Sequence, residues 1–180
     1  MTRFVALLRG VNVGGNKGVP MSALKDLAGR LSLGNPRTLL QSGNLVFSST
    51  GKSADALEHS LERVIRDDMG VETSICVRSA AQWTALVDAN PFLREAETDP
   101  SHLLLVAFKT SPKSSGPEAI AKAYAGPERI ELAKDHAFIV YPEGIGRSKL
   151  TPALLGRHLG EGTARNWNTV LKIQAALETD

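Results

Sequence analysis

The sequence predicts an α+β fold made of two ferredoxin-like subdomains of the βαββαβ type, with mainly antiparallel sheets and two helices at the end. Residues 1–78 alternate between apolar runs and amphipathic segments in the order strand, helix, strand, strand, helix, strand. Residues 79–180 partly repeat this pattern. A length of 180 residues with 42% hydrophobic content can bury a sizeable core. We therefore expect subdomains at 1–78 and 79–180, packed as one compact unit.

A buried strand and an amphipathic helix open the chain. Residues 4–8 form an uninterrupted apolar run that stops at Arg9 and Gly10, which is typical of a central strand. Pro20 suits the first turn of a helix, and Gly34 with Pro36 is expected to end it. The apolar residues of this helix recur at i, i+3, i+4 and i+7 and predict its buried face: Leu24, Leu27, Ala28 and Leu31.

A hairpin and a second helix follow. Residues 38–41 and 45–47 are apolar-rich runs on either side of a turn containing Gly43, which favours a β-hairpin. Ser53 can cap the next helix and Gly70 can close it. Its expected buried stripe is Leu57, Leu61, Val64 and Ile65, and its expected solvated face is Asp55, Glu58, Glu62, Asp67 and Asp68. Residues 71–77 alternate as a half-buried strand does.

The second half begins with a capping box. Ser79 and Gln82 have the spacing of that motif, and a short helix with Trp83, Leu86 and Val87 is expected before Pro91. The pattern then predicts a loop over 92–100, a buried strand over 102–108, a helix over 117–124, and paired strands over 129–132 and 137–141.

Two helices are expected to finish the chain, at 150–159 and 163–177. Thr163 is the predicted cap of the second one. Its predicted buried side is Trp167, Val170, Leu171 and Ala175.

Charge and cysteine content exclude several classes of protein. The formal net charge is 21 − 19 = +2, which is too small to indicate bulk nucleic-acid binding. No apolar run approaches 18 residues, so a membrane span is not expected, and we expect a cytoplasmic location. The single cysteine, Cys76, forbids an intrachain disulfide and favours a buried structural residue over a nucleophilic thiol.

No motif for metal or cofactor chemistry is present in the sequence. The four histidines are scattered, and neither H-E-x-x-H, C-x-x-C nor G-x-S-x-G occurs. We therefore expect no metal site and no cofactor, and assign no catalytic residue.

The first candidate site is the loop over residues 9–18, which holds four glycines, two asparagines and two cations. Backbone N–H groups, a following helix N-terminus and a lysine together form the usual cradle for a phosphate. The candidate ligand-binding residues are Arg9, Asn12, Gly14, Gly15 and Lys17. The residue order rules out a Walker loop. The same glycines and asparagines are equally typical of a compact turn.

The hairpin turn supplies a neighbouring set of polar groups. Gln41, Ser42 and Asn44 should lie near Asn12, because the first strand ends at the same edge of a βαββαβ sheet as this hairpin. Their amide and hydroxyl groups suit recognition of a polar ligand, without a general base. An ordinary turn explains them as well.

Two later segments repeat this chemistry. Arg147, Ser148 and Lys149 follow a strand and a pair of glycines, and they offer a second anion contact. Arg165, Asn166 and Asn168 are expected in the first turn of the last helix, where a cation opposes the helix dipole and an external anion relieves it. On that helix, Arg165 and Asn168 share a face with Thr169 and Lys172. A solvated face with Arg165 paired to a carboxylate is the alternative.

These strings together carry a family resemblance. Residues 7–15, 41–44, 90–92, 146–150 and 165–169 resemble, in order, the bacterial family called domain of unknown function 1697. The resemblance implies a compact bacterial α+β protein built from two ferredoxin-like parts. It implies no activity and no catalytic residue.

Three functions remain open at this point. The first is binding of a phosphate-bearing ligand, either a nucleotide or a nucleic-acid backbone, through the glycine-, asparagine- and arginine-rich loops. RNA reading by stacked aromatics is disfavoured, because the central strands supply only Phe4 and Phe47. The second is an enzyme acting on a small polar or phosphorylated metabolite, for which no base lies beside the motifs. The third is a protein-interaction module.

Overall fold

The computed structural model describes residues 1–13 and 18–179, and it confirms an α+β fold with two ferredoxin-like parts. The chain divides into two compact units, Met1–Val87 with Lys172–Asp180, and Asp88–Leu171. Each unit holds one four-stranded antiparallel sheet. The first unit extends past the expected boundary at residue 78, through residue 87, and also includes residues 172–180.

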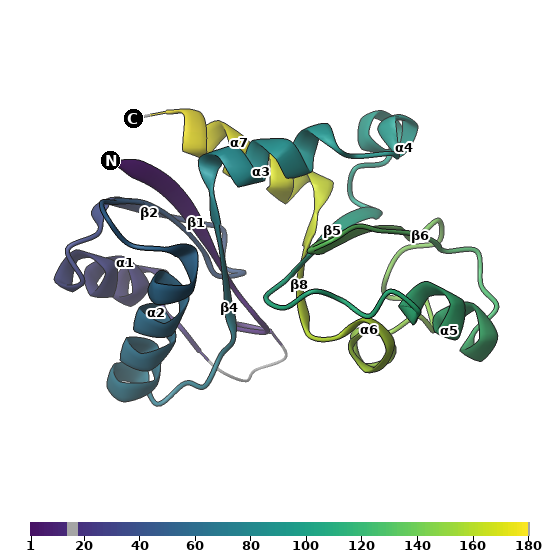
Figure 1. Cartoon of the computed structure of the whole chain (residues 1–180), viewed down its shortest axis with the longest axis horizontal. Coiled ribbons are helices and arrows are strands. Elements are labelled where there is room, and N and C mark those ends of the chain that lie inside the picture. Colours follow the sequence, from purple (N-terminus) through teal and green to yellow (C-terminus); the bar gives the residue numbers. More distant parts are fainter. Residues whose placement is uncertain (14–17, 180) are drawn as a thin grey trace. The chain divides into compact units, whose positions relative to one another are not determined.

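The first unit contains one complete βαββαβ pattern (Figure 1). Its elements are β1 (Thr2–Leu8), α1 (Met21–Arg30), β2 (Gly34–Leu39), β3 (Asn44–Ser49), α2 (Ala54–Met69) and β4 (Ile75–Ser79). The strand order is β2-β3-β1-β4, so β2 and β4 are the edge strands. A further helix, α3 (Ala80–Asp88), follows β4 without a linker.

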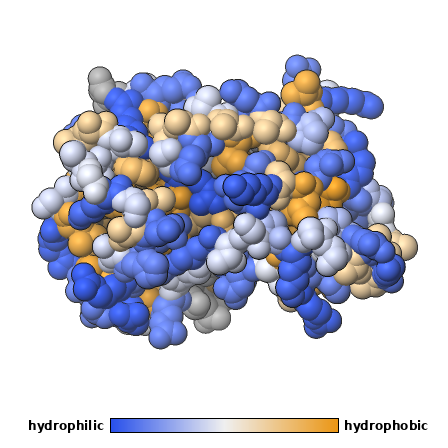
Figure 2. Space-filling model, viewed as in Figure 1, coloured by the Kyte–Doolittle hydropathy of each residue, from blue (hydrophilic) through white to orange (hydrophobic). Residues whose placement is uncertain are grey.

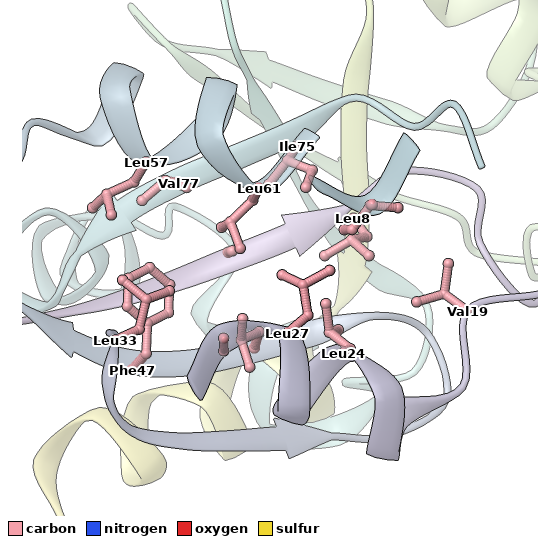
Figure 3. Packing of buried hydrophobic residues seen from close by; sticks show 14 of the residues in the cluster. Leu8, Val19, Leu24, Leu27, Leu33, Phe47, Leu57, Leu61, Ile75 and Val77 are labelled. Carbon is pink, nitrogen blue, oxygen red and sulfur yellow. The ribbon is translucent and has the colours of Figure 1, made fainter. Parts of the chain in front are cut away.

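The core of this unit lies between the sheet and its two helices. Leu24 and Leu27 of α1 meet Leu61 of α2 over alternate residues of the sheet (Figure 3). Phe4 and Phe47 belong to the same core, with ring centroids 5.8 Å apart. The predicted stripes of both helices are confirmed, with Leu31 and Val64 only partly buried. The opposite residues of β1 are buried as well, which is why that strand has no polar alternation.

The acidic face predicted for α2 is wrong at Glu58 and Glu62. Glu58 is 3% exposed and accepts a hydrogen bond from the Val77 backbone N–H at 2.8 Å. Glu62 accepts one from the Ile75 N–H, also at 2.8 Å. Four residues of a helix span ~6 Å along its axis, and two residues of a strand span ~6.6 Å. Two glutamates at i and i+4 of α2 can therefore each reach one of two alternate N–H groups along β4. The two carboxylates therefore satisfy donors on an edge strand.

The first hairpin begins earlier than the sequence predicts. Gly34 and Pro36 were expected to end the helix before the strand, but both lie in β2. Pro36 is tolerated there because β2 is an edge strand, and its register shifts between Gly34 and Arg37. Serine and glycine caps are confirmed on α2: Ser53 accepts the Ala56 N–H, and Gly70 adopts a left-handed conformation.

The capping box before α3 is confirmed in both directions. The Ser79 N–H donates to the Gln82 side chain at 2.8 Å, and the Gln82 N–H donates to the Ser79 hydroxyl at 3.2 Å. Trp83 of this helix is fully buried. Within the first unit, Arg3 donates to the Leu177 carbonyl at 2.8 Å and Arg37 to the Ala176 carbonyl at 2.8 Å.

The second unit repeats the pattern (Figure 1). Its elements are α4 (Leu93–Thr98), β5 (Leu103–Phe108), α5 (Gly116–Ala123), β6 (Arg129–Leu132), β7 (His136–Val140), α6 (Pro152–Leu159), β8 (Gly162–Asn166) and the start of α7 (Trp167–Glu178). The strand order β6-β7-β5-β8 matches that of the first unit position by position. The predicted loop at 92–100 is wrong, because α4 lies within it.

The end of the chain differs from the prediction of two successive helices. Residues 162–166 form β8, which pairs with β5, so neither Thr163 nor Arg165 is helical. Helix α7 begins at Trp167 instead. Its buried apolar residues are Trp167, Val170, Ile173 and Leu177, whereas Leu171 and Ala175 are exposed, contrary to the predicted stripe. Pairing to β5 outweighed the helical spacing of this segment.

A second core packs α5 and α6 on one face of the second sheet. It contains Val106, Ile120, Ile139, Tyr141 and Leu159. The surface view in Figure 2 shows hydrophilic residues interspersed with small hydrophobic areas. Within the residues that the structure describes, no helix combines the length and apolar character needed to cross a membrane.

Candidate functional site

The first candidate loop is closed by its own asparagine. The Asn12 amide donates to the Val19 carbonyl at 2.9 Å and to the Gln41 carbonyl at 2.8 Å, while its oxygen accepts the Val19 N–H at 2.8 Å. This confirms that the hairpin lies beside Asn12. Because all three bonds go to backbone groups, the Asn12 side chain stabilises the loop by joining its two ends and the hairpin.

The Arg9 backbone and the Asn44 side chain at this edge also have structural partners, while the predicted Gln41 is exposed. The Arg9 N–H donates to the Ser74 carbonyl at 3.0 Å, and the Thr73 hydroxyl donates to the Arg9 carbonyl at 2.8 Å. Asn44 is fully buried and donates to the Leu39 carbonyl and the Ser42 hydroxyl. The predicted residues Gly14, Gly15 and Lys17 lie outside the described residues.

The second unit gathers several candidates at one end of its sheet. Strands β7 and β8 both run antiparallel to β5, so their carboxyl ends point the same way. Loop 144–149, which carries Arg147, Ser148 and Lys149, therefore leaves the same end of the sheet as Asn166 and Asn168. With one strand between them, β7 and β8 lie roughly 10 Å apart.

Ser148 anchors that loop on a carboxylate. Its hydroxyl donates to Glu128 Oε1 and accepts the Leu150 N–H at 2.9 Å. The Tyr124 hydroxyl donates to the same Oε1 at 3.3 Å. Glu128 directly precedes β6, and Tyr124 ends α5, so α5, β6 and the loop meet at this cluster. Sequence reasoning missed Tyr124 and Glu128, whose roles become apparent only once β6 is aligned with β7.

A cavity of about 310 Å³ lies beside the cluster. Its walls come from α5, the segment after it, β6 and the end of the loop: Pro117, Ile120, Ala121, Tyr124, Ala125, Gly126, Glu128, Ile130 and Leu150. Tyr124 and Glu128 are the lining residues with polar side chains, and the others are apolar residues or glycine. A few polar side chains among apolar ones are typical of small-molecule sites.

Burial, together with the nearby Glu128 carboxylate, raises the pKa of Tyr141 to about 12. Tyr141 is 1% exposed, and its hydroxyl donates to the Leu150 carbonyl at 3.1 Å. The phenol therefore remains protonated at neutral pH and holds the far end of loop 144–149.

The two cations of the loop are available to a ligand. Arg147 and Lys149 are exposed, and neither side chain forms a hydrogen bond or ion pair within residues 1–13 and 18–179. Ser148 between them is bonded to Glu128, and Leu150, which follows Lys149, lines the cavity. The loop that carries the two exposed cations is therefore anchored to residues of the cavity wall.

The predicted residues near α7 have other roles. Arg165 is 8% exposed and donates to the Ala164 carbonyl at 2.8 Å. Ala164 pairs with Val106 of the cavity-side core, so the Arg165 side chain lies on the opposite face of the sheet. Asn166 caps α7 by accepting the Thr169 N–H at 3.0 Å. Asn168 is exposed in the first turn of α7.

A histidine lies close to Gly144 at the start of the loop. His102 Nδ1 is 2.7 Å from an Asp99 carboxylate oxygen, at ion-pair distance but without good hydrogen-bond alignment. A Cβ placed on Gly144 would be 3.1 Å from His102 Nε2. Gly144 also has a φ of +83°, so a glycine here both permits the turn and leaves the imidazole uncovered.

Within the described residues, no three His, Cys, Asp or Glu side chains are grouped in a way that could hold a metal ion. Cys76 is 2% exposed in β4, as expected of a structural cysteine.

Comparison with known proteins identifies the family and the fold. A family model described as a protein of unknown function, DUF1697, matches residues 1–138. A solved structure titled as the conserved bacterial protein SP0830 from Streptococcus pneumoniae matches with a TM-score of 0.74 and 22% identity, covering 98% of this chain and 99% of that one. None of the curated proteins matches. The motifs at 146–150 and 165–169 fall beyond the matched range. Because that range spans most of the sequence, the chain belongs to the DUF1697 family of proteins of unknown function.

Proposed function

We propose that this protein binds a small phosphate-bearing molecule at the end of the second sheet, with the phosphate on loop 144–149. One observation carries the proposal: Arg147 and Lys149 are exposed and unpaired within the described residues, on a loop whose central serine is fixed to Glu128. Because Ser148 already anchors the loop, binding an anion there requires less ordering of the backbone, and this favours binding. The cavity beside the loop accommodates the rest of the ligand.

The size of the cavity favours a small ligand over a nucleic acid. Proteins that read RNA on a sheet stack bases on exposed aromatic side chains. Phe4 and Phe47 are buried under α1 and α2 instead, at 6% and 1% exposure. The described residues of loop 9–18 also contribute less than their composition indicated, because the Asn12 amide is committed to the backbone.

A salt-dependent binding assay tests the proposal. We expect labelled nucleotides and small sugar phosphates to bind more weakly in high salt, since the contact is electrostatic. The double variant Arg147→Ala/Lys149→Ala should lose affinity by at least tenfold. A matched control, Lys134→Ala/Arg157→Ala, removes the same charge from exposed positions in the same unit, at the β6–β7 turn and on α6, and should bind as the wild type does.

Two outcomes would refute the proposal. Short RNA binding more tightly than every small phosphate would move the function to nucleic acid. Equal losses in the two double variants would mean that overall charge, not this loop, governs binding.

A second candidate function is catalysis on the same ligand, and the Asp99–His102 pair favours it. An imidazole with a carboxylate beside it is a common setting for a general base, and His102 Nδ1 lies 2.7 Å from an Asp99 oxygen. The sequence offered no base beside the cationic motifs, but the imidazole lies against Gly144 of the loop itself.

A turnover screen separates the two functions. Phosphorylated metabolites incubated with the protein and followed by phosphorus NMR would show new products if the protein is an enzyme. We expect His102→Gln to abolish such turnover while leaving ligand affinity within about twofold. Turnover that persists in His102→Gln would remove the histidine from the mechanism.

A further inference from the structure

The carboxylate in the cavity wall is only half satisfied. Glu128 Oε1 accepts hydrogen bonds from both Tyr124 and Ser148. Its other oxygen, Oε2, is buried and has no hydrogen-bond donor in the part of the chain that the structure describes. A buried carboxylate oxygen without a donor is unfavourable, so a group that brings an N–H or O–H to it is stabilised.

Gly126 keeps the cluster compact. Any side chain at this position would collide with both the Tyr124 hydroxyl and Glu128 Oε2. Glycine thus allows the backbone to close over the phenol and the carboxylate, in a wall of the cavity to which all three residues contribute. Glu128, which carries the unsatisfied oxygen, is one of the residues that line a space of about 310 Å³. That space exceeds the ~30 Å³ occupied by one water, so it has room for part of a ligand.

The cavity wall carries a carboxylate, and the loop bonded to that wall carries two cations. Glu128 is anionic in the wall, while Arg147 and Lys149 are cationic on the loop that Ser148 ties to that wall. A phosphate alone would be attracted by the loop and repelled by the carboxylate. A ligand with a phosphate at one end and a positive N–H donor at the other satisfies both.

We propose that the ligand is an amine-bearing phosphate, whose ammonium group donates to Glu128 Oε2 while its phosphate meets Arg147 and Lys149. This inference rests on the proposed function and specifies its ligand class. Glu128 is then the specificity-determining residue, and Tyr124 and Ser148 are positioning residues that hold Oε1.

Matched pairs of ligands test this directly. NMR titration of the whole protein with aminoalkyl phosphates of two to four carbons, and with their hydroxyalkyl counterparts, compares ligands that differ in one group. We expect at least a tenfold preference for the best amine over its hydroxyl partner. In Glu128→Gln this preference should fall below twofold, while affinity for inorganic pyrophosphate stays within twofold of the wild type.

The outcomes distinguish this inference from the proposed function. Pyrophosphate binding that depends on Arg147 and Lys149, without an amine preference in the wild type, overturns the amine proposal and leaves phosphate binding intact. An amine preference that survives in Glu128→Gln also overturns it. Absence of binding by every phosphate overturns both. If Glu128→Gln does not fold, Tyr124→Phe provides the readout, because it leaves Ser148 as the donor to Oε1, holds the carboxylate less firmly, and should reduce the amine preference without changing pyrophosphate affinity. An unchanged preference in Tyr124→Phe would then overturn the proposal.

Discussion

The two units repeat one strand order but use their polar residues differently. In each unit the last strand, β4 or β8, lies at the edge of the sheet and runs directly into a helix. Arg78 and Arg165 occupy the same place just before the capping residue, are both buried, and each donates to the preceding carbonyl, at 3.0 and 2.8 Å. The buried arginine is thus a feature that both units share. A structural role common to both positions explains Arg165 better than a ligand-binding role that only the second unit would have.

The two glycine-rich candidate loops, 9–18 and 144–149, follow non-equivalent strands and so leave opposite ends of the two equivalent sheets. Loop 9–18 follows the first strand of its unit and lies beside the β2–β3 hairpin, as the Asn12–Gln41 bond shows. Loop 144–149 follows β7, the third strand of its pattern. Similar loop composition therefore does not mean an equivalent position. In the first unit the asparagine amide is bonded to backbone, whereas the second loop keeps two cations unpaired in the described chain.

Gly43→Ala tests how tightly the hairpin closes on the first loop. Gly43 has a φ of +75°, and a Cβ there would lie 2.6 Å from Val11 Cγ2 and 2.9 Å from Leu8 Cβ. Left-handed strain and overpacking together should lower the free energy of unfolding by about 3 kcal/mol in urea titrations. Gly51→Ala is the control, because φ is +71° there with open space around it, and should cost about 1 kcal/mol. Equal costs would mean that the hairpin is loosely packed.

Protection of the edge strand is a second difference between the units. Helix α2 supplies Glu58 and Glu62 to β4, but α6, its counterpart, contains no carboxylate. Glu58→Ala should destabilise the protein by about 2 kcal/mol, because it leaves the buried Val77 N–H without an acceptor. Glu62→Ala, at a more exposed position, should cost less, and Glu58→Gln should recover most of the loss. A Glu58→Ala variant as stable as the wild type would remove this contrast between the units.

Glu58 also illustrates what the sequence could not reveal. Helix periodicity located α2 and its apolar stripe, but whether an acidic residue beside that stripe faces solvent depends on which strand lies next to it. Likewise, the spacing within 163–177 is compatible with a helix, and only the pairing of β8 with β5 makes its first part a strand. Local signals such as the Ser79–Gln82 box were reliable because they need no distant partner.

The candidate site was predictable only in part. Arg147, Ser148 and Lys149 stood out by composition, and the hairpin beside Asn12 followed from the topology. Tyr124 and Glu128 carried no signal, because α5, β6 and the loop after β7 must assemble before these side chains meet Ser148. Burial of Asn44 in its turn was equally inaccessible to composition.

Asn12→Ala sharpens the contrast between the two loops. Loss of three hydrogen bonds to backbone groups, two of them from the amide N–H₂, should destabilise the protein by about 1.5 kcal/mol, since part of the site is solvated. Hydrogen exchange at the Val19 N–H should accelerate, because that group loses its acceptor. Phosphate affinity should stay unchanged. A loss of phosphate affinity larger than in Arg147→Ala/Lys149→Ala would place the ligand site in the first unit instead.

The smallest predicted effect is a loss of stability at alkaline pH, and it reports on the buried phenol of Tyr141 in the second unit. The pKa of Tyr141 is raised to about 12, above an ordinary value near 10, so between these values the folded state retains a proton that the unfolded state has lost. Raising the pH through this window therefore favours unfolding, while below pH ~10 the tyrosine contributes no pH dependence. From pH 9 to 11 the wild type should lose about 1 kcal/mol more stability than Tyr141→Phe, measured by urea titration at each pH. Because both proteins share every other titrating group, the difference reports this phenol. Parallel losses in the two proteins would show that the Tyr141 hydroxyl, at the end of loop 144–149, is open to water.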